Sequence, residues 1–191
     1  MKYMGSKARI AKNICPIIQS FIDKSGAYIY VEGFVGGANV IDKISCDIRH
    51  GIDKNKYLIA LLKYAANGGE LLGRVSKDTY TDVKLNKDNY PDWLVGNVGF
   101  LASYNGKFFD GGYANTVIEH TKYGDKVRDY YQEGKRNLEQ QAPNLKDIIC
   151  DPVGDTLISN RINQTIYATP YHFEGFDARN AITAGEKPKI V

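Results

Sequence analysis

A short apolar segment followed at once by a cluster of glycines constrains the fold of this chain more than any other feature. Residues 28–32 (YIYVE) have the composition of a buried strand, and three glycines fall within residues 33–37 directly after it. Residues 38–45 (ANVIDKIS) then favour a helix, and a second strand is expected to end near Asp53. This order predicts a βαβ unit, and therefore a parallel sheet with a right-handed crossover.

The flanking segments predict further helices. Apolar residues recur every three or four positions in residues 8–23 and trace one face of a helix, at Ile10, Ile14, Ile17, Ile18 and Phe21. Pro16 interrupts this helix, so a kink or a late start is expected, and Ser25-Gly26 should end it. A second helix is expected over residues 54–69, with a glycine stop.

The middle of the chain has a different character. Residues 76–144 show helical stretches and loops without strong strand alternation, including a charged helix over residues 121–141 that should end before Pro143. Strand character returns in residues 147–151 (DIICD) and in residues 164–171 (QTIYATPY). We therefore expect an α/β core formed by residues 1–59 and 145–191, with residues 60–144 inserted into it as a helical lobe.

The composition excludes several classes of protein. Hydrophobic residues make up 43% of the 191 residues and charged residues 25%, so the chain as a whole is not expected to be disordered. No membrane span or signal peptide is expected. The three cysteines are scattered and odd in number, which argues against a disulfide framework and favours a cytoplasmic protein. The three histidines lack metal-ligand spacing, so no metal site is expected.

The glycine turn and Asp53 together suggest a ligand. A turn without side chains lets backbone N–H groups approach a ligand closely, and the expected helix N-terminus would add positive potential. Asp53 follows Gly36 by 17 residues at the end of the next strand, where a carboxylate can accept hydrogen bonds from two ribose hydroxyls. The alternative is a tight turn without a ligand and an aspartate that caps a helix. Since the spacing is not G-x-G-x-x-G, an adenosine-type ligand is favoured over a dinucleotide.

Several ordered motifs resemble the Dam-type DNA adenine-N6 methyltransferases. They are Tyr3-Met4-Gly5-Ser6-Lys7, the stretch from Tyr30 to Val40 (YVEGFVGGANV), Gly51-Ile52-Asp53, the stretch from Ser103 to Phe109 (SYNGKFF) and Arg128-Asp129-Tyr130-Tyr131. The resemblance spans residues 2 to about 171. It implies S-adenosyl-L-methionine as cofactor, double-stranded DNA as partner, and a Rossmann-like methyltransferase core that carries a helical DNA-recognition lobe.

The resemblance also implies roles for single residues. Tyr3 and Lys7 would help to hold the cofactor, and Asp53 would hold its ribose. Phe34 and the glycines, Gly36 and Gly37, would line its methionine side. Asp151 falls where the family has an acidic residue near the adenine of the cofactor, although Pro152 follows it in place of the usual aromatic residue.

The catalytic motif departs from the family pattern. The family strand normally ends in Asp-Pro-Pro-Tyr, whose acid accepts a hydrogen bond from the target amino group of a flipped adenine. Here the stretch ends in Ala168-Thr169-Pro170-Tyr171 and is one residue shorter, so Pro170 and Tyr171 remain and either Ala168 or Thr169 replaces the acid. A neutral hydroxyl is a weaker acceptor than a carboxylate, and no motif puts Glu174 or Asp177 in its place. We predict weak or absent methylation.

The middle of the chain supplies candidate DNA contacts, namely Tyr104, Asn105, Lys107, Lys126 and Arg128. The loop around Lys107 could enter a groove of the DNA or fill the gap left by a flipped base. The alternative is that Phe108 and Phe109 simply pack into the core of the lobe. For at least one of these two phenylalanines we favour packing. The cations of residues 122–136 could bind phosphates or could form an ordinary solvated helix face. The net charge of +3 permits either.

The position of Tyr171 limits how many strands the rest of the chain can add to the core. Only 20 residues follow it, too few for the roughly three further strands that a methyltransferase sheet of this type needs. We therefore expect four core strands, an exposed sheet edge and self-association through that edge. The leading hypothesis is a methylase that binds S-adenosylmethionine and DNA. The alternatives are an inactive homologue that binds DNA or a protein, and a small-molecule or RNA methyltransferase.

Overall fold

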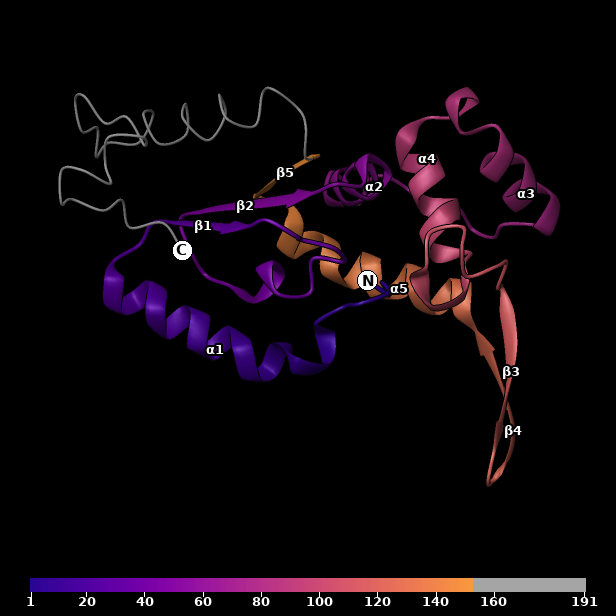
Figure 1. Cartoon of the computed structure of the whole chain (residues 1–191), viewed down its shortest axis with the longest axis horizontal. Helices are drawn as coiled ribbons and strands as arrows, with labels where there is room; N and C mark the ends of the chain where they lie inside the picture. The colour runs from indigo at the N-terminus through magenta and orange to yellow at the C-terminus, as the bar shows by residue number, and fades with distance from the viewer. Residues whose placement is uncertain (153–191) are drawn as a thin grey trace.

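A three-stranded parallel sheet forms the centre of the protein. The computed structural model describes residues 1–152, apart from the side chains at positions 117, 119 and 149–152. The strands are β1 (Ile29–Glu32), β2 (Ile48–Asp53) and β5 (Ile148–Pro152), in the order β1-β2-β5 (Figure 1). The parallel sheet expected from the sequence is thus confirmed, and these strands lie within one or two residues of their predicted bounds. The fourth expected strand lies outside the described residues.

Residues 1–152 contain five α-helices and several short helical turns. The α-helices are α1 (Ala8–Ser25), α2 (Lys56–Ala66), α3 (Lys77–Leu85), α4 (Asp92–Gly96) and α5 (Tyr130–Leu145). Helices α3 and α4 lie beyond α2 at one end of the sheet (Figure 1). The turns are η1 (Ile41–Lys43), η2 (Lys87–Asn89) and η4 (Tyr104–Gly106), together with the π-helical η3 (Asn97–Leu101). No helix in residues 1–152 is long and apolar enough to cross a membrane.

Helix α2 forms where the sequence predicted it. The side chain of Asn55 caps its first turn by accepting hydrogen bonds from the backbone N–H groups of Tyr57 and Leu58. It ends at Ala66, directly before Asn67 and Gly68, so the predicted stop is confirmed. The helix packs against β2, β5, α4 and α5 and is buried along one side, at Leu58, Ile59, Leu61, Leu62 and Ala65.

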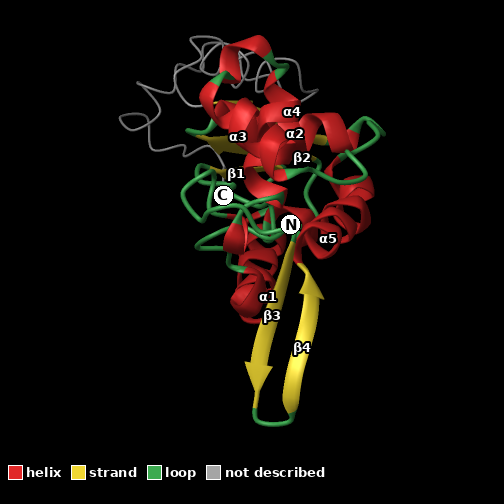
Figure 2. Ribbon diagram, turned by 90° about the vertical axis from the view of Figure 1, so that its right-hand side faces the viewer, coloured by secondary structure: helices red, strands yellow, loops and turns green. Residues whose placement is uncertain are grey.

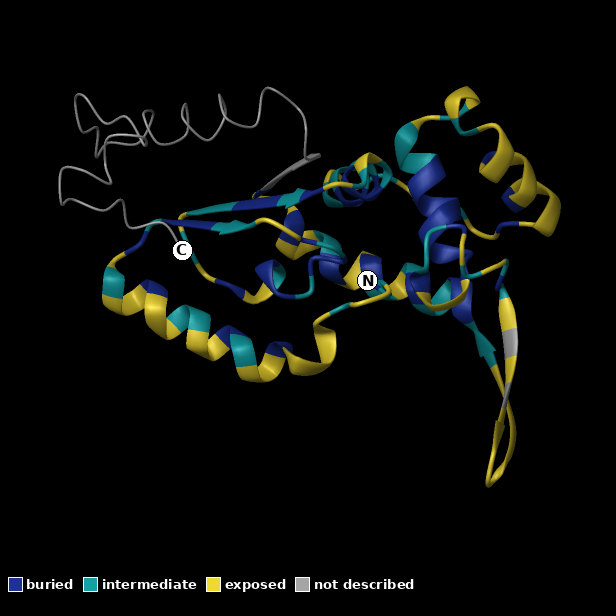
Figure 3. Ribbon diagram, in the orientation of Figure 1, coloured by how far each residue is buried: buried dark blue, intermediate teal, exposed yellow. Residues whose placement is uncertain are grey.

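Helix α1 turns only part of its predicted apolar stripe toward the core, where Ile14 and Ile18 are partly buried. The buried residues are the small side chains of Ala11 and Cys15, together with Ile22. Ile17 and Phe21, near the middle of the stripe, are 70% and 61% exposed, and the outer side of the helix is exposed along its length (Figure 3). Small residues allow the helix to approach the core closely, which decides the buried face. The helix starts at Ala8 and runs through Pro16, so the late start is wrong.

The helix predicted over residues 38–45 is not formed. Only the 3₁₀ turn η1 occupies this region. Ala38 has φ of 56°, a left-handed conformation that an α-helix cannot contain. Val40, Ile41 and Ile44 are all buried, so packing of this irregular segment prevails over its helical pattern.

The prediction of a charged helix over residues 121–141 is wrong in its first part. Residues 116–129 form an antiparallel hairpin of β3 (Thr116–Thr121) and β4 (Gly124–Asp129), and α5 begins only at Tyr130. The hairpin extends away from the body (Figure 2). Gly124, with φ of 111°, follows its two-residue turn, and Ile118 pairs with Val127 across the strands. At its other end α5 continues through Pro143 to Leu145, beyond the predicted stop.

Candidate functional site

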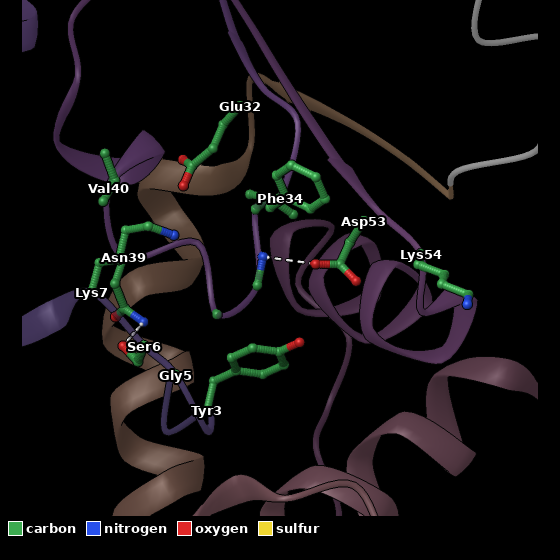
Figure 4. Close-up of a pocket in the computed structure, with 13 residues that line it drawn as sticks. Tyr3, Gly5, Ser6, Lys7, Glu32, Phe34, Asn39, Val40, Asp53 and Lys54 are labelled. Carbon is green, nitrogen blue, oxygen red and sulfur yellow. Dashed lines mark hydrogen bonds between the residues drawn. The ribbon is translucent and has the colours of Figure 1, made fainter.

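A cleft of about 240 Å³ lies at the carboxyl ends of β1 and β2. Ligands of parallel α/β sheets bind at this edge because the loops that follow the strands meet there. One wall comes from the turn after β1 and from the end of β2, and the other from the N-terminal segment (Figure 4). The lining residues are Tyr3, Gly5, Ser6, Lys7, Glu32, Phe34, Val35, Gly36, Gly37, Asn39, Val40, Asp53 and Lys54.

The glycines of the turn are required by the close approach of Tyr3. Gly36 has φ of 49°, and a Cβ built on it would lie 3.1 Å from Cε1 of Tyr3. A Cβ on Gly37 would lie 2.8 Å from Nδ2 of Asn39 and 3.0 Å from Cβ of Tyr3. Any larger residue would therefore push the N-terminal segment away from the turn.

Asp53 connects the end of β2 to the glycine turn. Its side chain is buried, Oδ2 accepts a hydrogen bond from the N–H of Gly36 at 3.0 Å, and Oδ1 accepts one from the N–H of Asn55 at 3.0 Å. The aspartate therefore holds the turn and the residue before α2, whereas the helix cap that the sequence left open as an alternative is provided by Asn55. Each carboxylate oxygen has two acceptor sites, so the group can still accept from ligand hydroxyls.

Glu32 is a second acid in the cleft that the sequence analysis did not single out. It is the last residue of β1, and its Oε2 accepts a hydrogen bond from the N–H of Ile41 at 3.0 Å. Burial raises the pKa of Glu32 to about 7, although that hydrogen bond and the charge of Lys7 act in the opposite direction. Its position at the end of a strand, directly before the turn, was the signal that could have identified it.

The N-terminal segment is tied to the turn by Asn39. Its Nδ2 donates to Oγ of Ser6 at 2.8 Å and to the carbonyl oxygen of Met1 at 3.2 Å. The Tyr3 ring is thereby held beside the turn, where burial and then the charge of Asp53 raise the pKa of its hydroxyl.

Six of the seven predicted cofactor residues line this one cleft. They are Tyr3, Lys7, Phe34, Gly36, Gly37 and Asp53. Phe34 is 82% exposed, so its ring is free to contact a ligand. The side chain of Asp151 lies outside the described residues, as do the predicted catalytic residues Thr169, Pro170 and Tyr171.

The source of positive potential differs from the expectation. The turn is followed by η1, which has only three residues, so no α-helix N-terminus follows it as predicted. The cations that line the cleft are instead Lys7 and Lys54.

A second group of predicted residues gathers around Tyr130 at the base of the hairpin. The Tyr104 ring lies 5.3 Å from the Tyr130 ring, and the Arg128 guanidinium lies 5.1 Å from it. Arg128 also donates to both oxygens of Glu133 at 2.7 Å. Tyr104 and Arg128 thus form one surface although 23 residues separate them in the sequence.

The hairpin carries cations and exposed apolar side chains. Lys126 and Arg128 share a face because strand residues alternate in direction. At the tip, Nζ of Lys122 lies 4.8 Å from the ring of Tyr123, which is 87% exposed. Two acids of the hairpin are paired: Asp125 with His120 at 2.6 Å, and Asp129 with Arg74 of a distant segment at 2.8 Å.

The remaining predicted DNA contacts, Asn105 and Lys107, lie in the loop that follows η3. Asn105 has φ of 54°, and Lys107 lies 4.0 Å from Asp110. Phe109 is buried and Phe108 packs against the core. The preference for core packing of at least one phenylalanine is confirmed.

Comparison with known proteins does not assign the chain to a family. No model of a known protein family matches it, and no curated protein sequence matches it. The geometry of the cleft and of the hairpin therefore carries the functional argument.

Proposed function

We propose that this protein binds S-adenosylmethionine and duplex DNA, with the Rossmann-like architecture of a Dam-type DNA adenine-N6 methyltransferase. The observation that carries the proposal is the joint position of Tyr3, the glycine turn and Asp53 in one cleft at the carboxyl ends of two parallel strands. Glycine at both positions of the turn leaves backbone groups accessible to a ligand.

In this proposal the residues of the cleft would contact the ribose and the methionine portion of the cofactor. Asp53 would accept hydrogen bonds from the ribose hydroxyls, and Gly36 and Gly37 would lie beside the methionine portion. Tyr3 and Phe34 provide aromatic surface, and an ionised Glu32 would attract the positive charges of the cofactor. When bound, the cofactor supplies an activated methyl group.

Calorimetric titration with S-adenosylmethionine tests this proposal. Wild type should bind one equivalent, and Asp53→Ala should bind at least about tenfold more weakly because a charge-assisted acceptor is lost. Asp47→Ala is the matched control, since Asp47 is an exposed carboxylate just before the same strand. No binding by wild type, or equal binding by wild type and Asp53→Ala, contradicts the proposed site.

The hairpin and the Tyr104 loop form the proposed DNA surface. A two-stranded β-ribbon fits the major groove of B-DNA, and Lys122, Lys126 and Arg128 would contact phosphates. Exposed apolar side chains on an isolated hairpin also favour a partner surface, here Ile118, Tyr123 and Val127. Titration with duplex DNA and with duplex RNA separates a DNA-directed protein from an RNA methyltransferase, since DNA should bind more tightly.

Catalysis is a separate part of the proposal. Because Thr169 stands where the family has an acid, we expect methyl transfer to DNA to be weak or absent. Transfer of a labelled methyl group from the cofactor at about 1 per second or faster would overturn this expectation. The alternative function is that of an inactive homologue, which would bind DNA or a protein partner without turnover.

Self-association and a cytoplasmic location remain part of the proposal. Within the described residues β1 pairs only with β2, and an open strand edge can pair with a second copy of the chain. Small-angle scattering of the purified protein tests this, because a monodisperse monomer contradicts it.

A further inference from the structure

Gln141 on α5 contacts the cofactor turn from the side opposite the cleft-lining Asp53. Its side chain is buried, with Nε2 donating to the carbonyl oxygens of Gly37 at 3.1 Å and Ala38 at 2.7 Å. Its Oε1 accepts a hydrogen bond from the Met1 amino group at 2.6 Å. With Oε1 facing the Met1 amino group, the N–H groups of the amide face the two carbonyl oxygens of the turn, which can only accept.

Gln141 makes the shortest hydrogen bond that the described residues offer to each of these two carbonyl groups. The other donors are farther away: the Met1 amino group lies 3.5 Å from the Gly37 oxygen, and the N–H of Asp42 lies 3.4 Å from the Ala38 oxygen. Ala38 is left-handed and only a three-residue turn follows, so no regular helix shortens the bond from four positions later. Gln141 therefore supplies the closest donor to both groups from more than 100 residues away in the sequence.

The turn is therefore held by two side chains that act on different groups. Asp53 accepts from the N–H of Gly36, and Gln141 donates to the carbonyls of the next two residues. Together they set the orientation of the peptide groups between Gly36 and Ala38. These peptide groups border the cleft on the side assigned to the methionine portion of the cofactor.

We propose that Gln141 is the positioning residue of the cofactor turn and determines affinity for the methionine portion of S-adenosylmethionine. This inference rests on the proposed function of the cleft. It makes α5, which begins directly after the hairpin, part of the support of the cofactor site. Adenosine would be held through Asp53, so its affinity should not depend on Gln141.

The test compares S-adenosylhomocysteine with adenosine by calorimetry. Gln141→Met removes both donors while retaining side-chain length and helix propensity. We expect it to bind S-adenosylhomocysteine about tenfold more weakly or worse, from the loss of two hydrogen bonds, and adenosine within about twofold of wild type. Gln140→Met is the matched control, since Gln140 is an exposed neighbour on the same helix, and it should bind both ligands as wild type does.

The outcomes separate this inference from the proposed function. If wild type binds neither ligand, the proposed cofactor site is wrong. If wild type binds both and Gln141→Met retains full affinity for S-adenosylhomocysteine, or loses both ligands equally, Gln141 is not a positioning residue. Should Gln141→Met not fold, Gln141→Glu keeps the side-chain shape and the acceptor for Met1, but has no N–H to donate when ionised. The same tenfold loss is then expected, and unchanged affinity overturns the inference.

A measurement on the wild-type protein needs no variant. The side-chain amide resonances of Gln141 should shift when S-adenosylhomocysteine is added, whereas those of Gln140 should not. Adenosine should leave both sets nearly unchanged. Absence of a selective Gln141 shift in a protein that binds S-adenosylhomocysteine overturns the inference.

Discussion

The cleft and the hairpin are built in opposite ways. Groups in the cleft are held by contacts between residues far apart in the chain, such as Gly36 with Asp53 and Gly37 with Gln141. Most of the hairpin is exposed and is stabilised by pairs within a few residues, such as His120 with Asp125. The cleft is thus preorganised by the fold, whereas the hairpin has side chains available for a partner. Perturbing the cleft should change stability, and perturbing the hairpin should change binding.

The largest expected effect is a substitution inside the turn. Gly37→Ala should lower the free energy of unfolding by about 1–3 kcal/mol, because the added Cβ meets Asn39, Tyr3 and the Met1 carbonyl. Gly33→Ala is the matched control, since a Cβ there meets nothing within 4 Å, and its stability should be unchanged or slightly higher. Denaturant unfolding measures both variants. Equal stability of the two would show that the turn is not tightly packed.

A smaller effect on stability is expected from replacing Glu32, the acid at the end of β1. The pKa of Glu32 is raised to about 7 from 4.5, so the folded state holds this proton more tightly than the unfolded state. Its contribution to stability is complete below about pH 4.5 and is lost as the pH rises through 7. Glu32→Gln should therefore lose less stability than wild type between pH 5 and pH 8, measured by denaturant unfolding.

The control for Glu32 is an ordinary surface carboxylate. Glu70→Gln removes an exposed acid and should retain the wild-type dependence on pH. If Glu32→Gln and wild type lose the same stability over this range, the burial of the carboxylate is not coupled to folding.

The smallest effect on stability is expected on the hairpin. Lys126→Ala should change the free energy of unfolding by less than about 0.5 kcal/mol, because the residue is exposed. It should lower DNA affinity severalfold and reduce the slope of log affinity against log salt by about 1. Filter binding of duplex DNA at several salt concentrations measures this slope.

A cation on another face serves as the control for Lys126. Lys24 lies in the last turn of α1. Lys24→Ala should leave both the affinity for DNA and its dependence on salt unchanged. Equal slopes for wild type, Lys126→Ala and Lys24→Ala would exclude the hairpin as a phosphate-binding surface.

Much of the sheet and most of the cleft could be predicted because their signals are local. The short runs of β-branched and aromatic residues in β1 and β5 mark these strands, and Gly68 marks the end of α2. The spacing of Gly36 and Asp53 puts both at the same edge once the strands are parallel. Glu32 was missed although its position at the end of β1, directly before the turn, was a local signal of the same kind.

The errors arose where packing prevails over periodicity. The stripe of α1 that includes Ile17 is apolar at helical spacing, yet the fully buried residues are Ala11, Cys15 and Ile22. Of the stripe itself, Ile14 and Ile18 pack against the core only in part. Residues 116–129 have mixed charge and a tyrosine next to a glycine, a pattern compatible with a helix as well as with a hairpin. Cross-strand pairing, such as that of Ile118 with Val127, decides between them.

The sequence by itself determined where the strands lie along the chain, the position of the glycine turn, and Asp53 as the acid beside that turn. These features depend on neighbours within about 20 residues. Only the tertiary structure decided that Tyr3 packs against Gly36, that the helix expected from Ala38 onward does not form, and that Gln141 supports the turn from α5. The physical reason is that buried carbonyl and N–H groups must find partners wherever the chain brings them, and those partners lie far away in the sequence.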